Sequence, residues 1–181
     1  GQYELPSKNK ELLEDDDLKR AASAALNGKN PDLLEYGTKQ AQMLEYYVTD
    51  HQGLRTTAVI KGCEFTLHMK VKFNEHIPGP IFAFSFKNVM GTEITGTNSM
   101  IEKAFLESVE AGEVKEVSFT QKMSLQGGEY LLSLGVTGYN KDTFEVYHRL
   151  YDALNITVVS DKDTVGFYDM DSKVEVKDCK S

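Results

Sequence analysis

The chain has 181 residues, of which 40% are hydrophobic and 27% are charged, as in ordinary soluble globular proteins. Its net charge is −8, so phosphate backbones and anionic lipid headgroups are repelled on average, and nucleic acid is not an expected partner. No apolar run approaches the ~18–20 residues of a membrane span.

The first 37 residues differ from the rest in composition. Residues 11–17 form a dense acidic run, and apolar residues then recur at helical spacing up to Gly28. Asn30-Pro31-Asp32 has the features of the start of a second helix, and Gly37 would end that helix. We predict a helical, acidic linker over residues 1–37 and the folded domain over residues 38–181. The acidic run is either a solvated face or a metal site.

From Thr38 the pattern changes to strands. Residues 63–73 show the cleanest alternation in the chain, and residues 81–87 alternate phenylalanine with small or polar residues. Asn88–Gly91 has turn residues, so residues 80–99 are predicted to form a β-hairpin. Further strands are predicted at 38–50, 113–121, 131–137 and 152–159, with a loop at 138–151 and a short extra strand at Val174 and Val176.

Eight or nine short strands separated by turn residues predict an all-β fold, an antiparallel β-sandwich or barrel. Gly128 and Tyr130, just before a long apolar strand, resemble the tyrosine corner of immunoglobulin-like sandwiches. The tail at residues 164–177 carries apolar residues beyond the last strand that the sandwich needs, so it is predicted either to contact a second protomer or to complete its own sheet.

Strict alternation also predicts which side chains face solvent, because a strand with one buried face turns its other residues outward. Polar residues of two strand regions are predicted to lie on one solvent-facing sheet surface: Thr66, His68, Ser85 and Thr95. Their apolar neighbours are predicted to be buried: Phe65, Leu67, Phe84 and Phe86. On this polar surface His68 is either plain exposed surface or a binding contact.

No catalytic signature is present. The chain lacks a P-loop, a GxSxG motif and a catalytic Cys–His pattern, and its four histidines lack metal-ligand spacing. We therefore predict no enzyme activity, no metal and no cofactor. Glu93 and Asp152 could serve a glycosidase by residue type alone, with structural or solvent roles as the alternative. Cys63 and Cys179 are either two reduced thiols or one disulfide.

Tyrosines suggest a binding function. Tyr139, Tyr147 and Tyr151 gather with His148 around the predicted loop. Aromatic rings suit neutral carbohydrate, because they combine apolar area with a hydroxyl, although such rings also serve as core plugs and loop anchors. The predicted ligand-binding set is His68, Ser85, Thr95, Tyr139 and Tyr147.

An ordered set of segments resembles one family. The segments are Tyr36–Met43, Phe84–Gly91 continuing into Ile94–Ser99, Ala111-Gly-Glu113, Gly128-Glu-Tyr130 with Leu132–Val136, and Tyr151–Val158. Together they are similar to the C-terminal domain of Wzt-type ATP-binding subunits, which belong to ABC transporters that export O-antigen and related polysaccharides. The resemblance spans residues 36–159.

The resemblance implies an immunoglobulin-like β-sandwich that binds the exported glycan at the cytoplasmic face of the cell membrane. It also implies a homodimer, an upstream nucleotide-binding domain of the same protein and a transporter permease as partners. Ligand contacts vary with the glycan in this family, so no contact set is carried over. The alternatives are a structural dimerisation module that binds no glycan, and a secreted adhesin-like sandwich.

Overall fold

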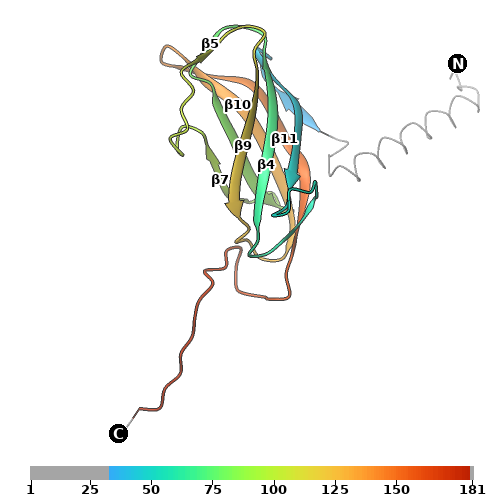
Figure 1. Cartoon of the computed structure of the whole chain (residues 1–181), viewed down its shortest axis with the longest axis vertical. Helices are drawn as coiled ribbons and strands as arrows, with labels where there is room; N and C mark the ends of the chain where they lie inside the picture. The colour runs from blue at the N-terminus through green and yellow to red at the C-terminus, as the bar shows by residue number, and fades with distance from the viewer. Residues whose placement is uncertain (1–32, 180–181) are drawn as a thin grey trace, which may run out of the picture.

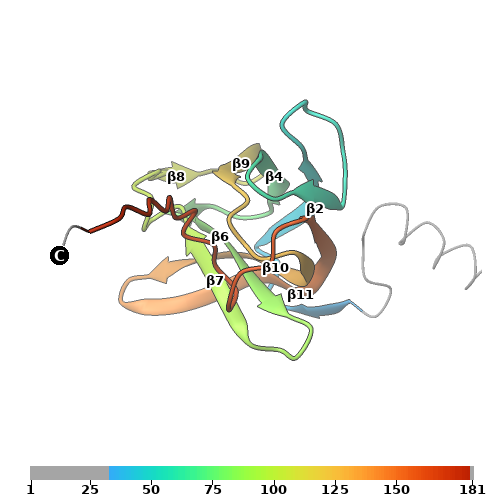
Figure 2. The same cartoon turned by 90° about the horizontal axis from the view of Figure 1, so that it is seen from below.

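Two sheets pack face to face in the computed structural model, which describes residues 33–179. The large sheet has the order β1-β11-β10-β6-β7, with β3 beside β11, and the small sheet has the order β2-β4-β9. Figure 2 shows β4 and β9 in one layer and β6, β7 and β10 in the other. The strands are β1 Leu34–Tyr36, β2 Ala41–Thr49, β3 Ala58–Ile60, β4 Glu64–Phe73, β5 Ile77–Pro78, β6 Ile81–Asn88, β7 Glu93–Asn98, β8 Ser108–Val109, β9 Val114–Lys122, β10 Gly128–Asn140 and β11 Thr143–Val159.

The core lies between the two sheets and follows the predicted alternation. The inward side chains of β4 are at most 2% exposed: Phe65, Leu67, Met69, Val71 and Phe73. The inward phenylalanines of β6 meet them edge to face, with centroid distances of 6.3 Å for Phe65–Phe86 and for Phe73–Phe82. Burial of these rings is the dominant stabilising term, because it removes apolar area from water. The all-β sandwich predicted from sequence is confirmed.

The predicted tyrosine corner is also present. The Tyr130 hydroxyl donates a 2.6 Å hydrogen bond to the carbonyl oxygen of Gln126. This bond ties the start of β10 to the preceding turn, as in immunoglobulin-like sandwiches. Tyr130 is 4% exposed, so the hydroxyl finds its partner without leaving the core.

The sandwich is closed along one side by a buried histidine. His148 on β11 is 1% exposed, and its Nδ1 accepts a 2.9 Å hydrogen bond from the backbone N–H of Met43 on β2. Its Nε2 lies 2.8 Å from Glu35 Oε1 on β1, and this contact lowers the pKa of Glu35. One ring therefore joins both sheets at this side. On the other side the edges of β7 and β9 pair with no further strand of the described chain.

One predicted loop and one predicted strand were wrong. The predicted loop over residues 138–151 is instead a long hairpin, because β10 runs on to Asn140 and β11 starts at Thr143 after a two-residue turn. Lys141 adopts a left-handed φ of 57° there, which the glycine-based turn rules did not flag. Val174 and Val176 form no strand.

The prediction of a second helix was wrong for those of its residues that the structure describes. Residues 34–36 form β1, which pairs with β11, since tertiary pairing overrides a local helix-start signal. Gly37 ends this strand with a φ of 129°, directly against the backbone of Tyr147, where a side chain would clash. The first predicted helix and most of the predicted linker lie outside the described residues.

The single polar surface predicted from alternation was also wrong. Each strand alternates as expected, but β4 belongs to the small sheet and β6 to the large sheet, so His68 and Ser85 point outward on opposite faces of the sandwich. Thr95 pairs with Phe86 rather than with Ser85, so it lies on the inward side of β7. The four expected apolar residues are buried.

Candidate functional site

The outer face of the large sheet carries a hollow with a floor of small residues. Ala83 and Ser85 on β6 stand opposite Gly135 and Ser133 on β10. On the other side of Ser85, Gly96 of β7 continues the row. The hollow encloses about 290 Å³. That volume is near the lower end for ligand pockets, roughly 300–1,000 Å³, and suits a single sugar unit.

The walls of this hollow are aromatic and charged. They are formed by Tyr151 and Arg149 from β11, Lys87 from β6 and Glu93 from β7. Lys87 Nζ and Arg149 Cζ lie 5.8 Å and 5.9 Å from the centroid of the Tyr151 ring. We call the floor and these walls the large-sheet hollow. Its ring, cations and hydroxyls can together satisfy both the apolar face and the hydroxyl groups of a sugar.

A β-bulge on β11 lies at Tyr151. Leu132 pairs with Leu154 and Leu134 with Leu150, so three residues of β11 stand opposite Ser133 alone. Within the bulge Asp152 has a left-handed φ of 52°, which is uncommon for a residue other than glycine. Bulges and such backbone outliers concentrate at functional sites, where they redirect side chains.

Hydrogen bonds hold the bulge in place. The Asp152 N–H donates to Ser133 Oγ at 2.9 Å, and the Asp152 carboxylate lies 3.3 Å from Lys87 Nζ. Ser133 is only 7% exposed, so its hydroxyl is fixed by this contact. A structural role was one of the alternatives predicted for Asp152. It is the central residue of the bulge, and its pairing with Lys87 joins β11 to β6 beside the hollow.

The outer face of the small sheet places His68 among residues that already bind one another. Its ring stacks on Tyr47 with a centroid distance of 4.6 Å, and its Nε2 lies 2.8 Å from Thr49 Oγ1. Arg55 covers the Tyr47 ring at 3.8 Å and pairs with Glu45 at 2.6 Å. Burial, and then the charge of Arg55, lower the pKa of His68.

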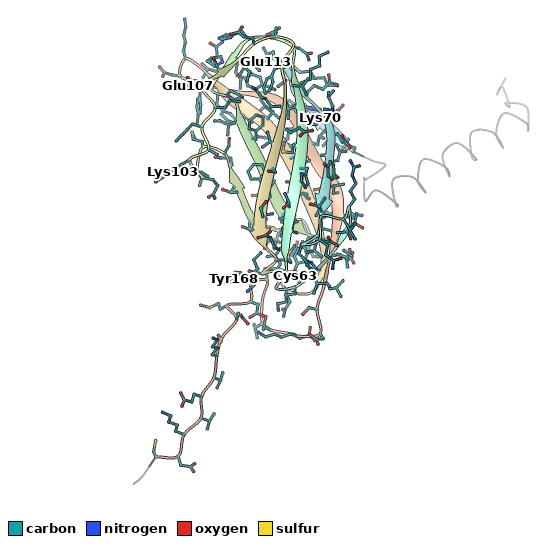
Figure 3. All side chains as sticks on the ribbon, viewed as in Figure 1. Cys63, Lys70, Lys103, Glu107, Glu113 and Tyr168 are labelled. Carbon is teal, nitrogen blue, oxygen red and sulfur yellow. The ribbon has the colours of Figure 1, made fainter. Side chains whose placement is uncertain are left out.

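A larger groove of about 1150 Å³ opens between the unpaired edges of β7 and β9. We call it the interlayer groove. Thr95 lines it together with core aromatics such as Phe84 and Phe119, whose rings meet at 5.1 Å. Tyr168, labelled in Figure 3, lines its lower end. This groove is an exposed part of the core rather than a pocket on an outer face.

The structure does not bring the five predicted ligand-binding residues together. Ser85 lies in the large-sheet hollow, His68 on the opposite face and Thr95 in the interlayer groove. Tyr139 is 45% exposed near the tip of the β10–β11 hairpin, where its ring meets Phe144 at 5.5 Å. The expectation that Tyr147 borders a surface site was wrong, because Tyr147 is 2% exposed.

Sequence reasoning missed Arg149, Ser133 and Gly135 as site residues. A usable signal was present, because Phe82-Ala-Phe-Ser-Phe86 and Leu132-Ser-Leu-Gly-Val136 both alternate large residues with small ones. In an outward-facing row, small residues on two strands leave a depression. That the two strands are neighbours could not be read from the pattern alone.

These features define the class of the protein as a two-sheet β-sandwich domain with a small hollow on the outer face of one sheet. No helix among residues 33–179 is long and apolar enough to cross a membrane, and no metal-binding cluster occurs in that range. The model of the Wzt C-terminal domain family matches residues 32–170. The chain therefore belongs to the Wzt C-terminal domain family, whose context is the ATPase of an ABC transporter involved in O-antigen export.

One solved structure shares the fold. The chain superimposes on the crystal structure of the C-terminal domain of wzt with a TM-score of 0.78 at 24% identity, covering 85% of this chain and 94% of that one. A more distant similarity, with a TM-score of 0.36 at 15% identity, is to the CARDB domain of PF1109 from Pyrococcus furiosus, over 66% of this chain and 95% of that one. No curated protein sequence matches the chain.

Proposed function

We propose that this domain recognises an exported cell-surface polysaccharide without catalysing a reaction, and that the large-sheet hollow holds one sugar unit of it. The observation that carries the proposal is the ring of Tyr151 beside a floor of small residues, at the place where β11 bulges. A sugar ring placed on that floor meets the tyrosine with its apolar face and the surrounding charged groups with its hydroxyls.

The family context supplies the partners and the location in this proposal. The domain works on the cytoplasmic side of the cell membrane, attached to its own nucleotide-binding domain and acting with a transporter permease. An exporter must release what it binds, so we expect weak affinity, with a Kd of ~1 μM–1 mM, about −8 to −4 kcal/mol.

The test is a titration of the isotope-labelled domain with the surface polysaccharide purified from the cells in which the chain occurs. Amide NMR chemical shifts monitor the titration. Shifts are expected at residues 83–87, 133–135 and 149–152. The same map tests the binding roles predicted for His68, Thr95, Tyr139 and Tyr147. Shifts confined to β4, or to the interlayer groove, would refute the large-sheet hollow as the site. The absence of any shift would refute glycan recognition.

A dimerisation role is the second candidate, and the C-terminal tail favours it. Val174 and Val176 are 84% and 89% exposed, and Figure 1 shows the tail leaving the lower end of the sandwich. The interlayer groove offers apolar walls and two unpaired strand edges, which suit an extended segment from a second copy of the chain. We propose that the tail of one protomer pairs with the groove of its partner in a homodimer.

The structure sharpens the test of this dimer. Residues 164–169 contact their own sandwich, since Gln126 bonds to Thr164 and Phe167, and Asp169 bonds to Ser124. A chain ending at Asp161 would lose those contacts as well as the tail, whereas a chain ending at Asp171 loses only the tail. Light scattering on the chain ending at Asp171 should show a monomer. A stable dimer of that shortened chain would show that the tail is not part of the dimer interface.

A further inference from the structure

We propose that Arg149 makes the large-sheet hollow specific for a sugar that carries an anionic group, either a carboxylate or a phosphate. This inference rests on the proposed function, because it names the ligand class of the same hollow. It concerns one side chain and its charge, and it is independent of how the polysaccharide continues beyond the hollow.

The position of Arg149 places its guanidinium in the hollow. On β11 it stands opposite Gly135, one of the floor residues. A Cβ at Gly135 would lie 3.9 Å from Arg149 Nε, so the arginine side chain passes directly over this glycine. Its Cζ is 5.9 Å from the centroid of the Tyr151 ring. The guanidinium and the aromatic ring therefore border the same small space.

Arg149 differs from the other cations of both faces in its charge partners. The chain has 28 acidic residues against 20 lysines and arginines, so carboxylates are plentiful. Lys87, the other cation of the hollow, already pairs with Asp152 at 3.3 Å, and Arg55 on the small sheet pairs with Glu45 at 2.6 Å. Among residues 33–179, Arg149 makes no ion pair and no side-chain hydrogen bond. Its donors are available to a ligand.

The remaining acid of the hollow does not cancel this charge. Glu93 stands opposite Lys87 in the pairing of β7 with β6, on the far side of the floor strand from β11. Lys87 is already paired with Asp152. Arg149 is therefore the one cation of the hollow without a carboxylate contact in the described chain. The charge of Arg149 therefore attracts an anionic group that enters the hollow.

Arginine suits this task better than lysine. Its planar guanidinium presents parallel N–H donors that match the two oxygens of a carboxylate or phosphate, and charge-assisted bonds of this kind are about twice as strong as neutral ones. A neutral sugar can use only single hydrogen bonds to the same group. Arg149 therefore distinguishes an acidic or phosphorylated sugar from its neutral counterpart.

The experiment compares three forms of one probe, the surface polysaccharide purified from the cells in which the chain occurs. One sample is untreated, one has its carboxylates reduced to primary alcohols, and one has its phosphate esters removed with hydrofluoric acid. Calorimetry measures the affinity of the full chain for each form. The variants are Arg149→Gln and Arg149→Lys, with Arg55→Gln as the matched control on the opposite face.

We expect one chemical treatment, and Arg149→Gln, each to weaken binding about tenfold, and added salt to weaken it further. Arg149→Lys should lose part of the affinity because it keeps the charge and loses the fork, and Arg55→Gln should bind as the unchanged chain does. The treatment that weakens binding identifies a carboxylate or a phosphate. Should Arg149→Gln not fold, Arg149→Lys and the treated polysaccharides still decide.

Two results would overturn the inference. If the untreated polysaccharide binds and neither treatment nor Arg149→Gln reduces its affinity, the anionic specificity is wrong while glycan recognition stands. If the untreated polysaccharide does not bind to the unchanged chain, glycan recognition fails and the inference fails with it.

Discussion

The two outer faces of the sandwich carry the same pair of residue types, a tyrosine beside an arginine. The two faces differ in how closely the arginine approaches the ring. On the small sheet, Arg55 lies 3.8 Å from the Tyr47 ring and His68 stacks on it at 4.6 Å. On the large sheet, the cations stand 5.8 Å and 5.9 Å from the ring of Tyr151. The first tyrosine is in close contact with its own chain, while the second borders a hollow.

This difference separates a structural cluster from a candidate binding site. Polar groups of the small-sheet face pair among themselves, as Thr66 and Thr120 do at 2.9 Å. Paired groups stabilise the fold but have little left to offer a ligand. On the large-sheet face the bulge at Asp152 interrupts regular pairing, and the small floor residues leave room.

Filling the floor should have the largest effect. In Ser85→Leu the new side chain occupies the hollow, so polysaccharide binding should fall below detection in calorimetry while the protein remains folded. Thr66→Leu is the matched control, because it adds similar bulk to the outward face of the small sheet. Equal losses in the two variants would mean that the hollow is not the site.

Removing each tyrosine should separate binding from stability. Tyr151→Ala should weaken polysaccharide binding about tenfold or more, about 1.4 kcal/mol, because the aromatic wall is lost. Tyr47→Ala should leave binding unchanged and lower the free energy of unfolding by about 1–2 kcal/mol, because it removes a ring stack and a cation–π contact. Chemical denaturation and calorimetry on both variants measure the two quantities. The reverse pattern would exchange the roles of the two faces.

Acid should loosen the segment that leads to the tail, because the carboxylate of Asp169 in that segment is paired with two lysines. Asp169 is 7% exposed and lies 2.8 Å from Lys61 and 2.9 Å from Lys162. Hydrogen bonds from Lys61 first, and then Lys162, hold the pKa of Asp169 far below its usual range. Such a carboxylate contributes stability above its unfolded pKa, ~3.9, and the contribution is lost as pH falls through the folded value.

Asp169→Asn should therefore lower the melting temperature at pH 7, and the difference from the unchanged chain should shrink below about pH 4. Asp171→Asn is the control, since its side chain is 74% exposed and should change little. A pH-independent difference between Asp169→Asn and the unchanged chain would contradict this assignment.

The smallest effect is expected from His68. Burial lowers its pKa, so the unfolded chain binds protons more readily, and stability should fall as pH drops from about 7 toward 5. His68→Gln should reduce this slope in a series of melting temperatures. The slope should remain in Arg149→Gln, which alters the other face. An unchanged slope in His68→Gln would show that this histidine is not coupled to folding.

Local patterns predicted a good part of the fold. The alternation in residues 63–73 and 81–87 assigned the buried faces of β4 and β6, and Gly128 with Tyr130 predicted the tyrosine corner. The hairpin over residues 138–151 was missed because Phe144–Tyr151 mixes aromatic, charged and apolar residues without a clear period. The bulge was missed for a different reason, because its extra residues exist only relative to β10.

The fold class and the inward or outward direction of each clear strand could be predicted from local patterns, because side-chain alternation is a property of one strand. It also carried the family resemblance, which the match over residues 32–170 confirms. Which strands share a sheet became clear only from the folded arrangement. That pairing set His68 and Ser85 on opposite faces, buried Tyr147 and brought Arg149 to Gly135, since strand order depends on contacts between residues far apart in the chain.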